Sequence, residues 1–367
     1  MFCIIRINKV IYVKLFDSEI LGIKNVNKKE PISPSTIIMI SLDSTNAIDI
    51  ILKNSLINIY IPKDNHKNMK IIKQIKISKS MKVSELVEAM SETGHQARKI
   101  GEAAKIFKNM IKDRECKVFF GLAGAMVPAG MKQVILDILD YTDVFTTTGA
   151  TLTHDLAETI GEKHYFVDEK SDDVKLQKKG FNRMFNTYMK NTAYENLEKF
   201  FEKNWHEISK CRTIKEILWK LGELIKGKGI LGKCWKNKIP IFCPALADSG
   251  IGLMIWGRKS AGKNISIDAF EDMKEIIDIA WTSKKSGVLY VGGGVPKNFI
   301  QQSLQFTKGS KYGIQITTDR QEYGGSSGAS LKEGISWGKM NPKAKFVDVF
   351  CDATIALPLI LSYVKSR

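Results

Sequence analysis

A lysine directly behind a tryptophan and a glycine is the first feature of this sequence that could do chemistry. Ser336-Trp337-Gly338-Lys339 precedes the apolar run FVDVFCDATIALPLIL. Apolar neighbours and an indole can desolvate a lysine amine and make it a nucleophile toward a carbonyl or imine carbon. Glu333, six residues before Lys339, could orient or neutralise a cationic amine. Spacing alone also fits a surface lysine beside a core tryptophan, so the motif by itself leaves both interpretations open.

Short apolar runs recur along the chain and indicate the elements that would position this chemistry. They are CKVFFGLAG, DVFTTTGA, IPIFCPAL, SGVLYVGGG, YGIQITTD and KFVDVFCDA. Each run ends in Gly, Ala, Asp or Ser before a helical pattern resumes, as buried parallel strands with crossover helices do. We therefore predict an α/β fold with a Rossmann-like parallel sheet and flanking helices. Ligands of such sheets bind at the carboxyl ends of the strands.

Three of the expected strand ends carry residues that suit a phosphate. These are Gly292 to Gly294, Gly121 to Gly130, and Thr148 to Asp155. Where side chains are missing, backbone N–H groups can approach a phosphate, although three glycines without the GxGxxG spacing also fit a tight turn. Several such turns in one chain favour a dinucleotide over chance turns.

Two acids and a histidine near strand ends each have two interpretations. Asp248 and Asp352 follow apolar runs, where a carboxylate can accept ribose hydroxyl hydrogen bonds or cap a helix. His154-Asp155 lies near the start of an expected helix, where an acid is common even without a ligand.

Length and composition bound the organisation of the chain. Its 367 residues with 44% apolar content fit one large domain or two ordinary ones. Residues 1–68 are rich in Ile, Asn and Lys, and we expect a poorly packed N-terminal extension of unknown role. Residues 69–367 are expected to form a single NAD-binding catalytic domain, with a mostly helical stretch at 171–240 beside the sheet.

Charge, cysteines and hydropathy exclude several classes. Almost half of the net charge of +17 falls in residues 1–82, and the other basic residues alternate with acids, as in ENLEKFFEKNWHEISK. This pattern indicates solvated faces, so we expect no nucleic-acid partner. Six cysteines without a CxxC pair predict neither a metal site nor a disulfide framework. No apolar run is long enough to span a membrane, and we expect a cytoplasmic protein.

Nine strings, taken together and in order, resemble the deoxyhypusine synthase family over roughly residues 80–367. They are GHQARKIGEAA, FFGLAGAMVPAGM, TTTGATLTHDL, KGFNRMFNTY, FCPALADSGIG, VGGGVPKN, QITTD, GGSSGASLKEGISWGK and FCDATIALPL. The resemblance implies a Rossmann-like NAD domain in a homotetramer whose active sites are shared between two subunits.

The resemblance also implies a reaction and its residues. NAD takes a hydride from a polyamine, normally spermidine, and the aminobutyl group passes through an enzyme-lysine imine to a lysine of a translation initiation factor precursor. Lys339 would be the nucleophile, Trp337 would pack on the methylene chain, and Glu333 would bind a terminal ammonium. NAD would contact Gly124, Ala125, Met126, Val127, Pro128, Thr148, Gly149, Ala150, His154, Asp248, Gly293, Thr318, Asp319, Asp352 and Ala353.

Three substrate-binding positions depart from the family pattern. Leu253 and Ser326 stand where acids are usual, and Asn298 stands where a histidine is usual. Each lost charge-assisted contact would be worth about 1.5–3 kcal/mol. This leaves open another amine donor, or a small-amine acceptor as in a homospermidine-type synthase. A basic RNA- or protein-binding module on a degenerate NAD fold is the non-enzyme alternative.

Overall fold

The computed structural model describes residues 70–366 in full and, ahead of them, the backbone of five strands. These are β1 (Cys3–Ile7), β2 (Val10–Lys14), β3 (Met39–Leu42), β4 (Ala47–Leu52) and β5 (Ser55–Tyr60). β1 pairs antiparallel with β2, and β3, β4 and β5 form an antiparallel sheet in that order. The chain divides into two compact units, Met1–Ile71 and Ile72–Arg367. The poor packing predicted for residues 1–68 concerns side chains that lie outside the described residues.

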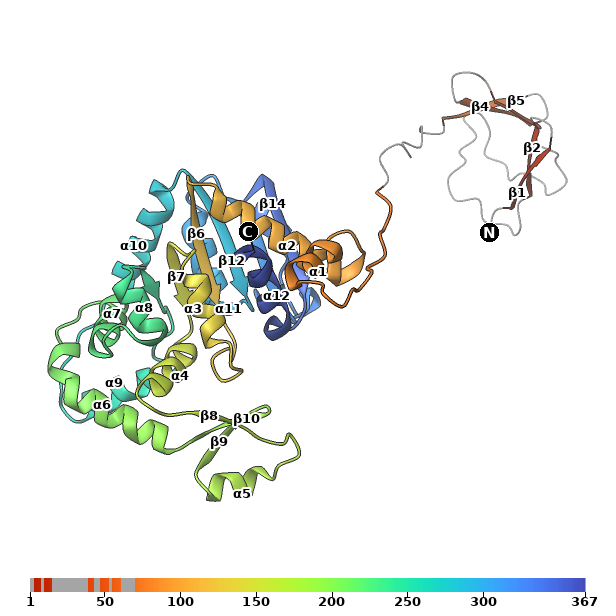
Figure 1. Ribbon diagram of the computed structural model, residues 1–367. Coiled ribbons are helices and arrows are strands. Elements are labelled where there is room, and N and C mark those ends of the chain that lie inside the picture. Colours follow the sequence, from red (N-terminus) through yellow and green to blue (C-terminus); the bar gives the residue numbers. More distant parts are fainter. Residues whose placement is uncertain are drawn as a thin grey trace. The chain divides into compact units, whose positions relative to one another are not determined.

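Six parallel strands form the central sheet of the second unit (Figure 1). They are β6 (Cys116–Leu122), β7 (Val144–Thr147), β11 (Ile241–Phe242), β12 (Lys285–Val291), β13 (Ser310–Thr317) and β14 (Met340–Phe350). Their order across the sheet is β11-β7-β6-β12-β13-β14, and every neighbouring pair is parallel. In chain order this is 3-2-1-4-5-6, the doubly wound arrangement. The predicted α/β class with a Rossmann-like parallel sheet is confirmed, and each of the six apolar runs overlaps one of these strands.

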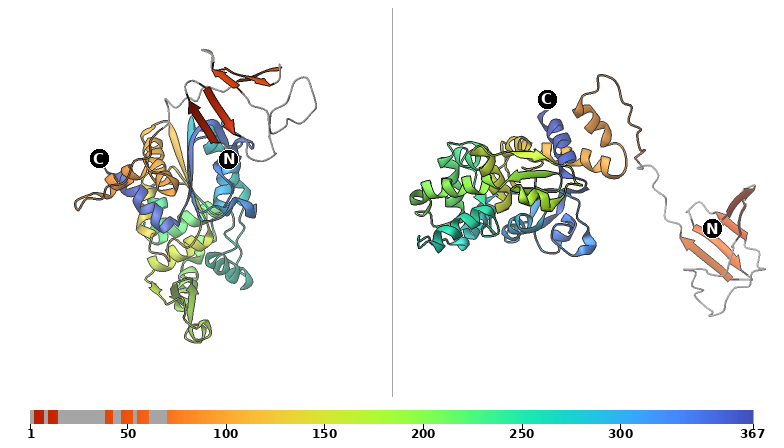
Figure 2. Two further views of the ribbon diagram at one scale, coloured as in Figure 1. Left: turned by 90° about the vertical axis from the view of Figure 1, so that its right-hand side faces the viewer. Right: turned by 90° about the horizontal axis from the view of Figure 1, so that it is seen from below.

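Helices cover both faces of this sheet (Figure 2). Successive residues of β6 point to opposite faces, so Val118 and Phe120 belong to one apolar core and Phe119 to another. The helices on the first face are α2 (His95–Lys112), α3 (Lys132–Leu139) and α12 (Ala353–Lys365), with α1 (Val83–Met90) packed on α2 and α12. The helices on the second face are α10 (Ala269–Thr282) and α11 (Gly294–Leu304). None of the helices in the described residues is long and apolar enough to cross a membrane.

A helical flank lies beside the sheet, and four of its six helices fall within residues 171–240, where the sequence predicted a mostly helical stretch. Its helices are α4 (Gly149–Thr159), α5 (Asp173–Lys178), α6 (Thr192–Ile208), α7 (Ile214–Leu224), α8 (Gly229–Lys236) and α9 (Gly250–Ser260). The sequence did not predict the small antiparallel sheet beside them, of order β8-β10-β9, formed by β8 (His164–Phe166), β9 (Phe181–Met184) and β10 (Thr187–Lys190). Aromatic pairs across its strands stabilise it, because the Tyr188 ring centroid lies 4.6 Å from that of Phe181 and 5.2 Å from that of Tyr165.

Gly121 in the middle of the sheet has no room for a side chain. An added Cβ would lie 2.8 Å from Cδ1 of Tyr290 and 3.2 Å from Cδ1 of Ile300. We therefore expect Gly121→Ala to lower the free energy of unfolding by roughly 1–3 kcal/mol through overpacking. Gly257→Ala, in an open position on α9, is the matched control and should be neutral or slightly stabilising. Urea unfolding of both variants checks this, and equal effects would contradict it.

Candidate active site

The order of the strands reverses between β6 and β12, and we call the edge formed by the carboxyl ends of these two strands the crevice. From β6 the chain continues through α3 to β7 on one side, and from β12 it continues through α11 to β13 on the other. Doubly wound sheets bind their ligands at this point. Gly124, with φ of 90°, turns the chain after β6, while Gly292 and Gly294, with φ of 69° and 56°, turn it after β12. These left-handed conformations are the physical reason for glycine here.

Gly293, between those two turns, is packed directly against another loop. An added Cβ would lie 2.2 Å from Cα of Ser327, which no side chain can occupy. The glycine therefore lets the backbone at the start of α11 and the loop around Ser327 approach each other. Gly293 itself is buried, whereas the neighbouring Gly292 and Gly294 are half-buried and could approach a ligand without a side chain in between.

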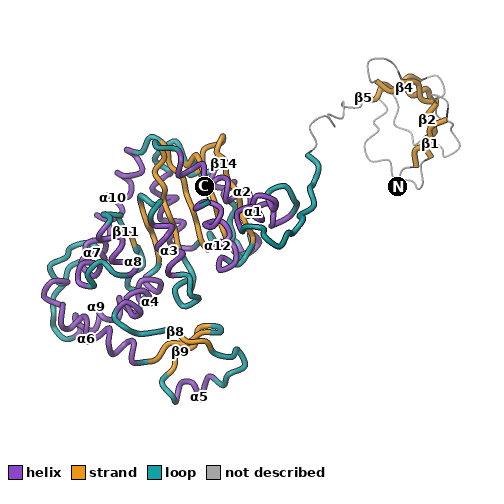
Figure 3. The backbone as a smooth tube through the Cα atoms, in the orientation of Figure 1, coloured by secondary structure: helices purple, strands orange, loops and turns teal. Residues whose placement is uncertain are grey.

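Four helices, α4, α9, α11 and α12, begin at or near this edge of the sheet (Figure 3). Thr148 and Ser249 cap α4 and α9 by accepting hydrogen bonds from Thr151 N and Gly252 N. Gly149 and Ser249 lie so close that a Cβ on the glycine would be 2.5 Å from Ser249 Oγ, so these two helix starts are in contact. Converging helix N-termini make the edge electropositive and suit the pyrophosphate of a dinucleotide.

The structure places the residues predicted to contact the cofactor at this edge. Those in the loops and helix starts that follow the strands are Gly124, Ala125, Met126, Val127, Pro128, Thr148, Gly149, Ala150, Asp248, Gly293, Thr318, Asp319, Asp352 and Ala353. His154 lies one turn farther along α4. The residues present fit NAD, because the crevice combines side-chain-free turns with helix N-termini. The assignment of these residues to cofactor binding stays a prediction.

The acids at the edge differ in what they already bind. Asp352 caps α12, accepting hydrogen bonds from the backbone N and Oγ1 of Thr354 at 2.7 and 2.8 Å. Asp319 accepts hydrogen bonds from Ser327 Oγ and from the Arg320 backbone N. The side chain of Asp248 is exposed and has no hydrogen-bond partner within residues 70–366. Asp248 is therefore the carboxylate best able to accept bonds from ribose hydroxyls, whereas Asp352 is first a helix cap.

His154 is hydrogen-bonded to a second histidine that the sequence did not single out. Its Nδ1 lies 2.9 Å from Nε2 of His164, whose Nδ1 lies 2.8 Å from a carboxylate oxygen of Glu158. Burial, with a contribution from the charge of His164, lowers the pKa of His154 to about 4. His154 is therefore neutral near pH 7.

A buried lysine holds the loop between β13 and β14. Lys297 on α11 is 2% exposed, and its Nζ donates to the carbonyl oxygens of Ser326 and Ala329 at 2.7 and 2.6 Å. Burial lowers the pKa of Lys297 to about 8, against the opposing charges of Asp348 and Glu333. The sequence carried a signal for this residue, because Lys297, Ile300 and Leu304 share the helical spacing of the buried face of α11.

Two further side chains fasten the same loop. Gln315 of β13 donates from Nε2 to the carbonyl oxygens of Ser327 and Ala329 at 3.2 and 3.1 Å. Asp348 of β14 accepts hydrogen bonds from Ser330 Oγ at 2.6 Å and Leu331 N at 3.1 Å. Residues 326–331 are therefore fixed from α11, β13 and β14 at once. The 3-10 helix η3 (Leu331–Ile335), which carries Glu333, follows directly.

Lys339 lies at the end of this loop, immediately before β14. Its Nζ is 5.1 Å from the ring centroid of Trp337, in cation–π geometry. Trp337 is 60% exposed, so it is not a core tryptophan, which the interpretation of Lys339 as an ordinary surface lysine requires. Gly338, with φ of 70°, and a hydrogen bond of 2.8 Å from Lys339 N to Gly334 O fix the backbone. An indole that stays on the surface beside a lysine favours the amine-binding interpretation.

The backbone of Lys339 lies at the opposite end of α11 from the glycine turn after β12. Met340 pairs with Ser310, so Lys339 lies at the amino ends of β13 and β14. An added Cβ on Gly338 would lie 3.8 Å from the carbonyl oxygen of Gln305, which ends α11. α11 spans about 17 Å from Gly294 to Leu304. The Lys339 side chain extends from the far end of this helix, and its charge still lowers the pKa of Lys297. The predicted residues thus form two groups, a crevice group and a lysine group.

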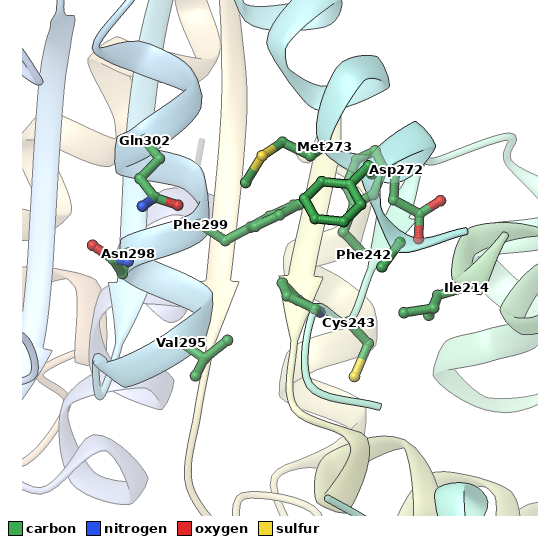
Figure 4. Close-up of a pocket in the computed structure, with 12 residues that line it drawn as sticks. Ile214, Phe242, Cys243, Asp272, Met273, Val295, Asn298, Phe299 and Gln302 are labelled. Atoms are coloured by element: carbon green, nitrogen blue, oxygen red, sulfur yellow. The ribbon is translucent and has the colours of Figure 1, made fainter. Parts of the chain in front are cut away.

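The three positions that depart from the family pattern lie in different places. Ser326 donates to Gly294 O at 3.3 Å, next to the glycine turn, and Leu253 is 53% exposed on α9. Asn298 lines a pocket of about 280 Å³ between α10 and α11, where it projects from α11 one turn before Gln302 (Figure 4). The buried Asp272 also lines this pocket, and burial raises its pKa to about 6.

Sheet order, crevice and loop define a doubly wound α/β protein of the dinucleotide-binding type with a separate surface lysine. The family model for deoxyhypusine synthase matches residues 85–364. The chain belongs to the deoxyhypusine synthase family, which is a family of transferases.

Individual relatives agree with this assignment. The chain is 40% identical to "Probable deoxyhypusine synthase 1" of Archaeoglobus fulgidus, over 79% of this chain and 96% of the relative. It is also 40% identical to the protein of the same name from Methanosarcina mazei, over 81% and 95%. A crystal structure from Entamoeba histolytica that carries the family name has a TM-score of 0.53 and 20% identity, covering 80% of this chain and 96% of that chain. The last similarity supports the fold.

The depressed pKa of His154 should make stability depend on pH. An unfolded chain binds a proton at this histidine below about pH 6.5, while the folded protein resists protonation down to about pH 4. His154 therefore contributes a loss of stability as the pH falls through this window, about 2 kcal/mol between pH 7 and 5. His154→Gln should remove that part of the slope, whereas His206→Gln, an exposed control, should keep it. Urea unfolding at both pH values measures this, and equal slopes would contradict the prediction.

Proposed function

We propose that this protein is an NAD-dependent aminobutyl transferase of the deoxyhypusine synthase type. It takes the aminobutyl group from spermidine and transfers it, through an imine on Lys339, to a lysine of the hypusine-carrying translation initiation factor. The observation that carries this proposal is the Lys339 amine lying over an exposed indole in a chain of this family. A lysine with no function beyond solvation does not require an exposed tryptophan ring in contact with its amine.

Each residue of the lysine group has a role in this proposal. The Lys339 nitrogen attacks the imine carbon of the oxidised amine, the three-carbon diamine part of spermidine leaves as a free amine, and Lys339 carries the aminobutyl group as an imine. Trp337 packs on the methylene chain, and Glu333, exposed on η3, pairs with the terminal ammonium. Bound NAD would supply hydride acceptance and return, and the crevice residues would hold it.

A second copy of the chain would join the two groups. The backbone of Lys339 lies at the far end of α11, a helix about 17 Å long, from the crevice of its own chain. We infer that Lys339 and Trp337 of one copy face the crevice of another, within a homotetramer. The exposure of Trp337 supports this, because an aromatic ring of that size is usually covered in an assembled site.

The amine and the acceptor have an alternative within the same chemistry. Leu253 is an exposed apolar side chain where an acid would hold an ammonium group. This supports an alternative in which the amine donor is not spermidine, or in which the acceptor is a small amine as in homospermidine synthesis. Mass spectrometry after incubation with labelled spermidine, NAD and either the factor or putrescine separates the two acceptors.

A basic nucleic-acid-binding module is the less supported alternative. Many lysines are paired with acids on the surface, among them Lys105 with Glu88, Lys285 with Glu115, and Lys365 with Asp137. Such pairing reduces the potential available to a phosphate backbone. The free cysteines of the described residues fit the cytoplasmic location that we propose.

Replacing the nucleophile tests the covalent step. Lys339→Arg keeps the positive charge and removes the amine that forms the imine. We expect borohydride trapping of labelled spermidine on the protein to disappear and NAD affinity to change less than about threefold. Lys332→Arg, on the same loop and exposed, is the matched control and should trap normally. Normal transfer by Lys339→Arg would show that Lys339 does not form the covalent intermediate with the aminobutyl group.

Mixed subunits test the shared site. Lys339→Arg and Asp248→Ala should each be inactive alone, since one lacks the lysine and the other the ribose-binding acid. If each site combines two copies, co-assembled mixtures regain about a quarter of wild-type activity, because half of the pairs are hybrids with one intact site of two. Tagged hybrids isolated by two-step affinity purification give the measurement. Inactive hybrids would place the lysine and the crevice of one site on the same copy.

A further inference from the structure

Glu158, His164 and His154 form a hydrogen-bonded relay beside the crevice. This relay can determine whether His154 offers a ligand a hydrogen-bond donor or an acceptor. Ala150, His154 and Glu158 are four residues apart and lie on one face of α4, which begins at the edge of the crevice. His164 reaches this face from β8, with its ring centroid 4.9 Å from that of His154. His154 is therefore one helical turn from Ala150 at the start of α4, and its ring contacts His164.

Buried and charged groups surround Glu158, the carboxylate end of the relay. Lys132 Nζ lies 2.9 Å from Oδ1 of Asp155 and 3.4 Å from Oε2 of Glu158. Asp155 is fully buried and accepts hydrogen bonds from the backbone N of Ile230 and Leu231. Burial would raise the pKa of Glu158, but the hydrogen bond from His164 and the charge of Lys132 outweigh it and lower that pKa. Glu158 is therefore an anion and acts only as an acceptor.

Proton counting then determines the tautomer of His154. Because Glu158 only accepts, His164 must donate from Nδ1. When the pair of histidines is neutral, Nε2 of His164 is an acceptor, and His154 must donate from its own Nδ1. Nε2 of His154 then carries a lone pair, and no partner of this atom is found within residues 70–366. When the pair holds one extra proton on His164, His154 accepts at Nδ1 and presents an N–H at Nε2 instead.

We propose that Glu158 and His164 are positioning residues that hold His154 in the Nδ1–H tautomer, with Nε2 as a hydrogen-bond acceptor for a donor group of the dinucleotide. One proton taken up by the histidine pair reverses this polarity and weakens binding. The inference rests on the proposed NAD binding. The charged groups that face the pair are Glu158 and Asp155 of α4 and Lys132 of α3. Burial raises the pKa of Asp155, and the charge of Lys132 opposes that effect.

The tautomer itself can be measured without the cofactor. Long-range nitrogen–proton spectra of protein labelled at its five histidines, at pH 8, should show His154 as the Nδ1–H form. The signal is assigned by its loss in His154→Gln. In His164→Ala the imidazole loses its partner and should revert to the Nε2–H form that free imidazoles prefer. An Nε2–H form in the unmodified protein would overturn the relay.

Binding of NAD tests the role of the exposed nitrogen. By calorimetry at pH 8 we expect His164→Ala to bind NAD about tenfold more weakly than the unmodified protein. Glu158→Gln, whose amide can donate to His164 and reverse the chain, should weaken binding likewise and serves if His164→Ala does not fold. Glu162→Gln is the matched control, because Glu162 binds Thr192 and Asn196 outside the relay.

The pH profile separates positioning from mere stabilisation. NAD affinity of the unmodified protein should fall when the pair takes up its proton on acidification, and His164→Ala should show a flatter profile. Equal affinities of His164→Ala and Glu162→Gln at pH 8, or parallel pH profiles, would overturn the proposal. A protein that binds no NAD at all would contradict the proposed function, while the tautomer measurement decides the relay independently.

Discussion

The structure depends on one constraint, the all-parallel pairing of six strands. Successive strands are added on one side of β6 and then, from β12 onward, on its other side. Parallel pairing brings every carboxyl end to the same edge, and the reversal separates the loops after the two central strands. Four helices then begin around that gap, and their N-termini set its electrostatics. The glycines follow from the same constraint, because Gly121 leaves room for Tyr290 within the sheet and Gly293 lets α11 approach the neighbouring loop. The crevice is thus a consequence of topology, and its side chains adjust what it binds.

Lys297 shows how the second group of residues is held away from that edge. A cation buried to this degree is stable only when its donors are satisfied, and two of them reach backbone carbonyl oxygens of the loop between β13 and β14. Gln315 and Asp348 hold the same few residues from the sheet. The loop is therefore pinned at its middle, and its last part runs along α11 toward the amino ends of the strands. Glu333, Trp337 and Lys339 are presented on a rigid support even though they lie in irregular backbone.

Much of this could be predicted from the sequence, for identifiable reasons. Buried parallel strands are apolar along their whole length, so the six runs were visible, and strand-end residues such as Gly293 and Asp248 follow from them. The hairpin of β9 and β10 was not visible, because it depends on aromatic pairs such as Phe181 with Tyr188 that form only after folding. The contact of His154 with His164 was hidden for the same reason. The position of Lys339 was in principle readable, since a residue that precedes a parallel strand lies at its amino end. Only the hydrogen bonds showed that Asp352 caps a helix and that the Asp248 side chain has no partner within residues 70–366.

The separation of lysine and crevice within one chain changes how the motif Ser336-Trp337-Gly338-Lys339 should be understood. In a complete site an amine-binding indole would be covered, yet Trp337 is mostly exposed and Lys339 lies over its face. Leu253 and Trp256 on α9 are likewise exposed apolar side chains. Exposed apolar surface on both groups is expected if each is one half of a site that another copy completes. In the proposed site the chemistry of the lysine then depends on what the second copy brings near it, and helix N-termini and glycine turns are the features of the crevice that would receive a dinucleotide. Association would therefore be a condition for catalysis, and stability of the single subunit would not be enough to produce it.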